Sequence, residues 1–141
     1  MKNFFIVLTA AVIISLSANC QGLKVPETVK NAFAAKFPNA TNVTWGKENA
    51  KEYEAEFKWN NSSVSANFGM GGSWVETETT IPASELPAAV TDFVHSKYPG
   101  AAYSRVEKIE KPGGKILYEV NIKVSGKKKE LELNADGSLA E

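Results

Sequence analysis

Two pairs of glutamates are the residues of this sequence whose type and spacing come closest to a catalytic arrangement. Glu54 and Glu56 are two residues apart, as are Glu76 and Glu78, so each pair projects from one side of an extended strand. Paired carboxylates can hydrolyse glycosidic bonds when they converge in a pocket and at least one has a raised pKa. Solvent-exposed strand faces carry the same pattern, so the alternative to a catalytic pair is a polar surface without catalysis.

The other chemically capable residues lack the partners that catalysis or metal binding requires. His95 follows Asp92 by three residues on a predicted helix, but no nucleophile elbow of the Gly-x-Ser-x-Gly type accompanies them. Residues 134–138 resemble the start of a calcium loop without its closing glutamate, so they predict a turn. One His and one Cys exclude multi-histidine and cysteine-rich metal centres. We therefore predict no enzyme, no cofactor and no metal site.

The charge of the chain argues against nucleic acid as a partner. Across 141 residues, 16 Lys and Arg balance 16 Asp and Glu, so the formal net charge is zero. Such a chain has no general attraction for nucleic acid or anionic membranes. The basic run from Lys127 to Lys129 is followed at once by acidic residues, which suits a soluble hairpin tip. A composition with 43% hydrophobic and 23% charged residues is typical of a globular domain.

The first 20 residues predict export from the cytoplasm. Lys2 precedes the uncharged apolar run from Phe4 to Leu16, which is shorter than the ~20 residues of a membrane span, and small and polar residues continue to Cys20. This order is typical of a secretory signal peptide. Two interpretations of Cys20 stay open: lipidation as the first residue of the mature chain, or removal with the signal peptide. The predicted location is periplasmic or lipid-anchored in the cell envelope, with membrane contact only through that anchor.

Residues 21–141 form a single predicted body in which one pattern occurs twice, at about 24–81 and 84–141. Each copy starts with a proline and a helical stripe and ends that helix with an aromatic-proline pair. Later features keep the same order in both copies. The matched features are Pro26 with Pro87, Phe37-Pro38 with Tyr98-Pro99, Tyr53-Glu54 with Tyr118-Glu119, and Gly72-Ser73 with Gly137-Ser138. Repetition at this period predicts two supersecondary units that bury their apolar faces together.

Periodicity predicts which elements position the glutamates. Apolar residues recur at helical spacing from Val29 to Phe37 and from Val90 to Tyr98. Alternating strands follow, among them 53–59 and 118–124, with glycine- or asparagine-containing turns between neighbours. The predicted fold class is α+β, with two tandem helix-plus-four-strand antiparallel repeats and with the helices packed on one face of the sheet. The other face is left to water or to a partner.

The repeated pattern resembles a known family. It combines a Val-x-Trp strand at 43–45, a Tyr-Glu-Ala-Glu-Phe strand at 53–57 and a Gly-Ser-Trp-x-Glu-Thr turn and strand at 72–77. These features are similar to the PepSY-like family of exported bacterial proteins, which is related in architecture to the beta-lactamase-inhibitor-protein fold. The resemblance implies a sheet with helices behind it and a role in binding or inhibiting envelope proteins. It implies no catalytic residues.

We therefore predict an exported, non-enzymatic protein that captures or inhibits another envelope protein or peptide through its helix-free sheet face. Strict alternation puts Trp74 on the same side as Glu76, which makes Trp74 the predicted hydrophobic anchor. Trp45 and Trp59 are assigned to the core. The predicted polar contacts come from Glu54, Glu56, Glu76, Asn121 and Lys123. The alternatives are a small envelope hydrolase that uses paired carboxylates and a structural envelope lipoprotein.

Overall fold

The computed structural model describes residues 22–140, so the predicted signal peptide and Cys20 lie outside the described residues. The helices and strands follow one another as α1 (Glu27–Lys36), β1 (Thr41–Asn49), β2 (Glu52–Trp59), β3 (Ser62–Gly69), β4 (Trp74–Thr80), the short 3-10 helix η1 (Ala83–Glu85), α2 (Ala88–Lys97), β5 (Ala102–Lys111), η2 (Pro112–Gly114), β6 (Lys115–Val124) and β7 (Lys127–Asn134). The fold is α+β, which confirms the predicted class.

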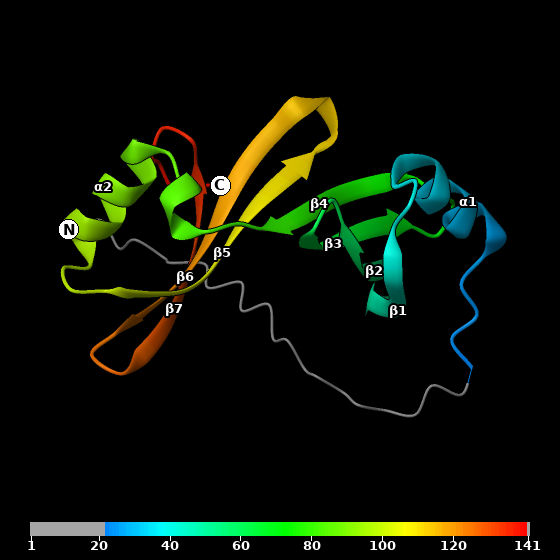
Figure 1. Cartoon of the computed structure of the whole chain (residues 1–141), viewed down its shortest axis with the longest axis horizontal. Coiled ribbons are helices and arrows are strands. Elements are labelled where there is room, and N and C mark those ends of the chain that lie inside the picture. The colour runs from blue at the N-terminus through cyan, green and yellow to red at the C-terminus, as the bar shows by residue number, and fades with distance from the viewer. Residues whose placement is uncertain (1–21, 141) are drawn as a thin grey trace, which may run out of the picture.

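All seven strands join one sheet in chain order, from β1 to β7, and each neighbouring pair is antiparallel. The sheet twists strongly, and α1 and α2 lie near its two ends (Figure 1). The register connects the two ends through one continuous row of paired residues that runs across β3 to β7. This row consists of Val64, Thr79, Lys108, Tyr118 and Leu133. Because paired residues point to the same side of a sheet, the row defines one side along its length.

Each helix begins after a proline and ends before one. Pro26 and Pro87 precede the first helical residues, where the missing N–H of proline costs no hydrogen bond. The helices close with bonds from the Phe37 amide to the Phe33 carbonyl and from the Tyr98 amide to the Val94 carbonyl, both 2.8 Å long. The prolines that follow at 38 and 99 cannot continue the helix.

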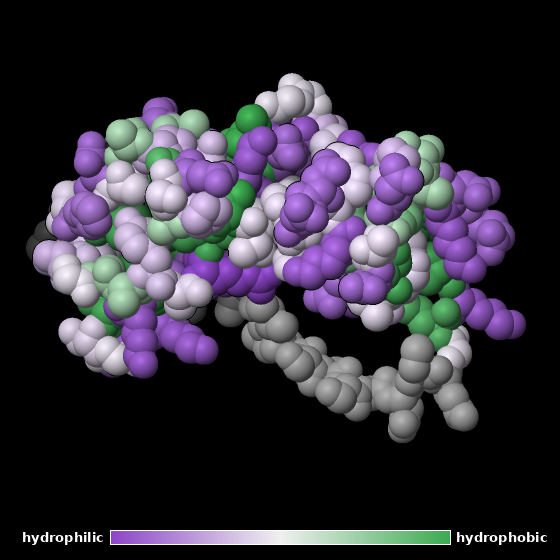
Figure 2. All heavy atoms as spheres, in the orientation of Figure 1, coloured by the Kyte–Doolittle hydropathy of each residue, from purple (hydrophilic) through white to green (hydrophobic). Residues whose placement is uncertain are grey.

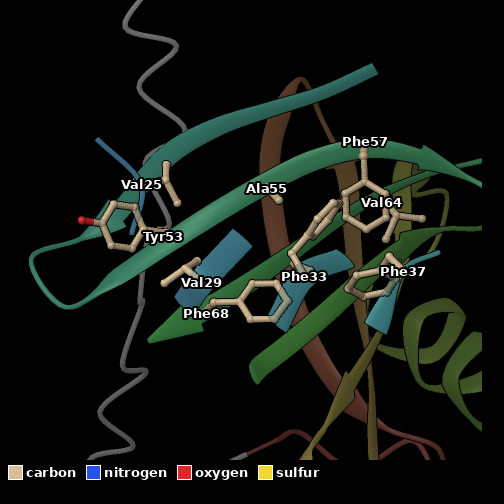
Figure 3. Packing of buried hydrophobic residues seen from close by; sticks show 10 residues of the cluster. Val25, Val29, Phe33, Phe37, Tyr53, Ala55, Phe57, Val64 and Phe68 are labelled. Carbon is tan, nitrogen blue, oxygen red and sulfur yellow. The ribbon is translucent and has the colours of Figure 1, made fainter. Parts of the chain in front are cut away.

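The core beneath α1 is aromatic. Phe33 points from α1 into a group of rings on β2 and β3 (Figure 3), and its centroid lies 4.9 Å from that of Phe57 in an edge-to-face arrangement. Such geometry stabilises aromatic pairs beyond the area they bury. Trp45 and Trp59 pack against this cluster, as predicted for the core. The buried members are Val25, Val29, Phe33, Phe37, Tyr53, Ala55, Phe57, Val64, Ala66 and Phe68.

The core beneath α2 is mostly aliphatic. Val90 and Val94 of α2 are fully buried against β5, β6 and β7. The buried members are Leu86, Val90, Val94, Val106, Val120, Ile122, Leu131 and Leu133. The row of paired residues described above starts in the first cluster, at Val64, and ends in the second, at Leu133. Both helices therefore cover the same side of the sheet.

The prediction of four strands in the second half is wrong, because only β5, β6 and β7 form there among the described residues. The chain turns at Gly137, whose φ is +84°, and Leu139 then pairs with Leu133 through an isolated bridge. Asp136 holds this turn by accepting hydrogen bonds from the amide and hydroxyl of Ser138, at 2.9 and 2.6 Å. The predicted turn is present, and it leaves the fourth strand as a single point of pairing.

Candidate binding face on the helix-free side of the sheet

The side of the sheet opposite the helices is rich in carboxylates. Alternation along β2 buries Tyr53, Ala55 and Phe57 under α1 and turns the residues between them to the other side. Register pairs carry the pattern across the sheet, from Glu54 through Asn67 to Glu76 and from Glu107 through Glu119 to Glu132. We call this surface the acidic face. Its carboxylates are Glu54, Glu56, Glu76, Glu78, Glu107, Glu119, Glu130 and Glu132.

The acidic face is hollowed over β1 to β5. A groove of about 300 Å³ is lined by residues of β1, β2, β3, β4 and β5, including Thr44, Glu56, Ser65, Thr80 and Glu107. A flat sheet cannot bring residues of its first and fifth strands to one hollow, so this side of the twisted sheet is concave. On the side of the molecule that Figure 2 shows, hydrophobic residues appear mainly in gaps between hydrophilic ones.

Glu107 is the most deeply buried carboxylate of the acidic face, with 3% of its surface exposed. Its Oε1 lies 2.6 Å from Nη2 of Arg105, two residues earlier on β5. A buried carboxylate without a counter-charge is strongly destabilising, and the ion pair with Arg105 offsets the cost of burying Glu107. Arg105 and Glu107, which both line the groove, are therefore paired with each other.

Burial raises the pKa of several other carboxylates on this face. The pKa of Glu78 is raised to about 8, first by burial and then by the negative charges of Glu107, Glu119 and neighbouring glutamates. The pKa of Glu119 is raised to about 7 by burial and by Glu130, against a lowering contribution from the Asn121 hydrogen bond. These shifts show that the carboxylates of β4, β5 and β6 lie close enough to repel one another.

Burial likewise raises the pKa of Glu54 and of Glu130. For Glu54 the charges of Glu56 and Glu48 act in the same direction, and a hydrogen bond with Ser65 opposes them. The crowding of negative charge therefore extends from β2 to β7.

Polar and basic side chains hold some of these carboxylates, either within one strand or across to the next. Asn67 Nδ2 donates to Glu76 Oε1 at 3.1 Å, and Asn121 Nδ2 donates to Glu119 Oε1 at 2.7 Å. Lys111 Nζ lies 3.2 Å from Glu76 Oε2. Asn67 is 6% exposed, and its Oδ1 is buried without a hydrogen-bond partner. The face consequently presents many acceptors and few donors.

Most of the predicted site residues do come together on this side. Alternation and register place Glu54, Glu56, Glu76 and Asn121 on the acidic face, with Lys123 exposed at the end of β6. Sequence reasoning missed Asn67, Arg105 and Glu107 as members of the face. Their signal is the alternation along β3 and β5, which the sequence pattern contains but which needs the strand register before the strands can be combined.

Trp74 is the exception, and its predicted position on the helix-free side is wrong. A register shift lies between Asn67, which pairs with Glu76, and Phe68, which pairs with Trp74. This bulge turns Trp74 to the side of the buried Phe68, where it packs against the core under α1. Lys36 of α1 lies 3.5 Å from the centroid of the Trp74 ring, and Trp74 Nε1 donates to the Thr77 hydroxyl at 2.9 Å.

The conditions for hydrolysis by paired carboxylates are not met in one place. The groove is lined by Glu56 and Glu107, whereas the pKa values raised to about 8 and about 7 belong to Glu78 and Glu119, which do not line it.

Among residues 22–140, no three or more His, Cys, Asp or Glu side chains are grouped to hold a metal ion. His95 lies on α2, with its ring centroid 6.4 Å from that of Tyr103. No helix of the described range is long and apolar enough to cross a membrane.

Comparisons with known proteins agree with this architecture. The pattern of the family described as "Putative beta-lactamase-inhibitor-like, PepSY-like" matches residues 19–64 and 51–141. A BLIP-like protein from Bacteroides fragilis is similar in structure, with 26% identity, a TM-score of 0.72 and coverage of 86% of each chain. None of the curated proteins matches this chain.

Two further crystal structures share the fold. A DUF2874 family protein from Bacteroides ovatus has 23% identity and a TM-score of 0.75, over 85% of this chain and 87% of the other. A protein from Bacteroides eggerthii, described as one of the "putative periplasmic proteins", has 20% identity and a TM-score of 0.75, over 84% and 87% of the two chains.

Proposed function

The chain belongs to the PepSY-like, beta-lactamase-inhibitor-like family, and from this premise we propose that it is an exported, non-enzymatic binding protein. Its target is another envelope protein or peptide, which it captures or inhibits through the acidic face. The observation that carries the proposal is the uneven covering of the sheet. Both helices cover one side, while the opposite side is concave and holds a groove of about 300 Å³. A concave surface with convergent polar groups is a common form of binding site.

The known proteins support the class of function and the location. The Bacteroides fragilis protein is described as BLIP-like, and the Bacteroides eggerthii protein as one of the "putative periplasmic proteins". Together with the predicted signal peptide at 1–20, these descriptions favour an exported protein of the cell envelope. Lipidation of Cys20 remains a proposal, as does its alternative, removal with the signal peptide.

We assign the polar contacts with the target to Glu54, Glu56, Glu76, Asn121 and Lys123. The first four belong to the acidic face, and Lys123 extends it at the end of β6. Trp74 is left out of this set because its ring is covered by Lys36 on the helix side. Recognition through this face therefore rests on charge and hydrogen bonding rather than on an aromatic anchor.

We also propose that the body is a tandem repeat, with copies at about 24–81 and 84–141. Two close approaches of the backbone support this division. Gly72 lies against the Thr28 carbonyl at the start of α1, and Gly137 lies against the Ala89 carbonyl at the start of α2. The same glycine-serine pair thus meets the first turn of a helix in each half.

Site-specific photocrosslinking in intact cells tests the proposed function. A photoreactive amino acid replaces Glu56 or Lys123, which are exposed on the helix-free side, and in matched controls it replaces Ala35 of α1 or Lys97 of α2. We expect one crosslinked partner of defined mass from the first two positions and none of that mass from the controls. Equal products from both sides of the sheet, or products from the helix positions alone, contradict the proposal.

A further inference from the structure

The middle of the acidic face gathers carboxylates. Register and alternation place four lysines on the same side, each within two residues of a strand end: Lys58, Lys115, Lys123 and Lys128. Among residues 22–140, the ion pairs on this face are those between Arg105 and Glu107 and between Lys111 and Glu76. Lys58 donates to the hydroxyl of Ser63. Of the eight carboxylates that define the acidic face, those without an ion pair are Glu54, Glu56, Glu78, Glu119, Glu130 and Glu132. The chain as a whole is neutral, so the excess of carboxylates is local to the middle of this side.

Asn67 gives a second, independent sign that the face lacks hydrogen-bond donors. Register places Asn67 between Glu54 and Glu76, within the acidic face, and only 6% of the surface of Asn67 is exposed. Its Nδ2 is used by Glu76, while its Oδ1 has no partner. A buried acceptor without a donor is destabilising, and a donor supplied by a ligand removes that cost.

The spread of the acceptors indicates the size of the occupant. They lie on β2, β3, β4, β6 and β7, and neighbouring strands are ~4.8 Å apart. A single cation cannot reach across so many strands. The arrangement also lacks a grouping of carboxylates that could hold a metal ion within the described range. Several cationic groups carried on one backbone fit the distribution better.

We propose that the occupant of the acidic face is a polypeptide segment rich in arginine and lysine, presented by the target protein. This inference rests on the proposed function and names the chemistry of its partner. Guanidinium groups supply several N–H donors in a planar fork, which matches carboxylates and the free Asn67 oxygen.

Proton release is a consequence that distinguishes this occupant from others. Near pH 7 the carboxyls of Glu78 and Glu119, with pKa values raised to about 8 and about 7, hold much of their proton in the free protein. The groups facing them are Glu54, Glu76, Glu107, Glu130 and Arg105, of which only the last is positive. A bound cation favours the ionised form and lowers both pKa values, so binding releases protons.

Titration calorimetry with two hexapeptides tests the proposal. Hexa-arginine is the cationic probe, and hexa-citrulline has nearly the same shape without the charge. At pH 7 and low salt we expect hexa-arginine to bind and hexa-citrulline to bind at least tenfold more weakly, by roughly the loss expected for charge-assisted contacts. Repeating the titration in buffers of different ionisation enthalpy measures the protons released. Binding of both peptides with equal affinity overturns the proposal.

A double variant localises the effect. Glu78→Gln with Glu119→Gln keeps the shape of both side chains, and we expect it to weaken the binding of hexa-arginine roughly tenfold and to reduce proton release. The control, Glu27→Gln with Asp92→Asn, replaces two carboxylates on the exposed surfaces of α1 and α2. Equal weakening in both double variants overturns the proposal, because it shows attraction by total charge alone. Circular dichroism of each variant verifies that it is folded.

The two proposals fail separately. A crosslinked partner that persists at Glu56 in the double variant, together with no binding of hexa-arginine to the native chain, rejects the cationic segment and keeps the binding face. Loss of every crosslink from the helix-free side rejects the proposed function itself. Binding of hexa-arginine with loss in the double variant supports both.

Discussion

Among single residues, Glu78 is the one whose ionisation is most changed by its surroundings, and its effect on stability is testable. Its pKa is raised from 4.5 to about 8 in the folded chain. Between these values only the folded state holds the proton, so the free energy of unfolding falls as the pH rises through this window. Above about pH 8 both states are ionised and the loss is complete.

We predict that Glu78→Gln stabilises the protein at pH 9 by about 1 to 2 kcal/mol and leaves its stability nearly unchanged at pH 4. This magnitude allows for the partial exposure of the side chain, which weakens the full effect of the shift. Urea denaturation of both chains at several pH values measures the difference. A difference that does not change between pH 4 and pH 9 contradicts the raised pKa.

Two glycines decide how each helix meets the end of a strand. Gly72 has a φ of +90°, and a Cβ there would lie 2.8 Å from the Thr28 carbonyl oxygen; Gly137 has a φ of +84°, and its Cβ would lie 2.5 Å from the Ala89 carbonyl oxygen. A side chain at either position meets both a left-handed backbone and a collision with a helix. The control is Gly113, which has a φ of +79° and open space around it.

We predict that Gly72→Ala and Gly137→Ala each lower the free energy of unfolding by about 2 to 4 kcal/mol, while Gly113→Ala lowers it by about 1 kcal/mol from backbone strain alone. Chemical denaturation of the three variants measures these values. If the free energy of unfolding falls by the same amount in all three variants, the contact between glycine and helix contributes nothing beyond the backbone strain at positive φ.

The sequence predicts elements well where one period dominates. The helices at 27–36 and 88–97 follow from apolar spacing and flanking prolines, and β2 follows from strict alternation. Alternation also predicts the side on which Glu54 and Asn121 lie. These features depend only on neighbours along the chain, which a single sequence contains.

Features set by contacts between strands could not be predicted in this way. The bulge opposite Phe68 moves Trp74 to the helix side, and no residue type in β4 predicts this bulge. Similarly, the reduction of the last strand to a bridge at Leu139 depends on how the Asp136 turn is held. The grouping of Glu78, Glu107 and Glu119 needs the register of three strands, and the sequence supplies only their separate alternation.

At the scale of the whole molecule, a net charge of zero conceals a separation of charge. The acidic face gathers carboxylates from β2 to β7, whereas the described residues also include exposed lysines on the two helices, such as Lys36 of α1 and Lys97 of α2. A neutral protein with evenly mixed charges is held together slightly by attraction, so added salt leaves it unchanged or weakens it. Like charges gathered on one side predict the opposite sign.

We therefore predict that raising sodium chloride from 0.05 to 0.5 M at pH 9 stabilises the protein by roughly 1 kcal/mol, because salt screens the repulsion among ionised carboxylates. At pH 5 the carboxyls of Glu78 and Glu119 hold their protons and the gain is small. Thermal denaturation across the two salt concentrations measures the effect. The Glu78→Gln, Glu119→Gln double variant loses most of the gain at pH 9, whereas Glu27→Gln with Asp92→Asn retains it. A salt effect of the same size at both pH values, or in both double variants, shows that the charge separation has no energetic weight.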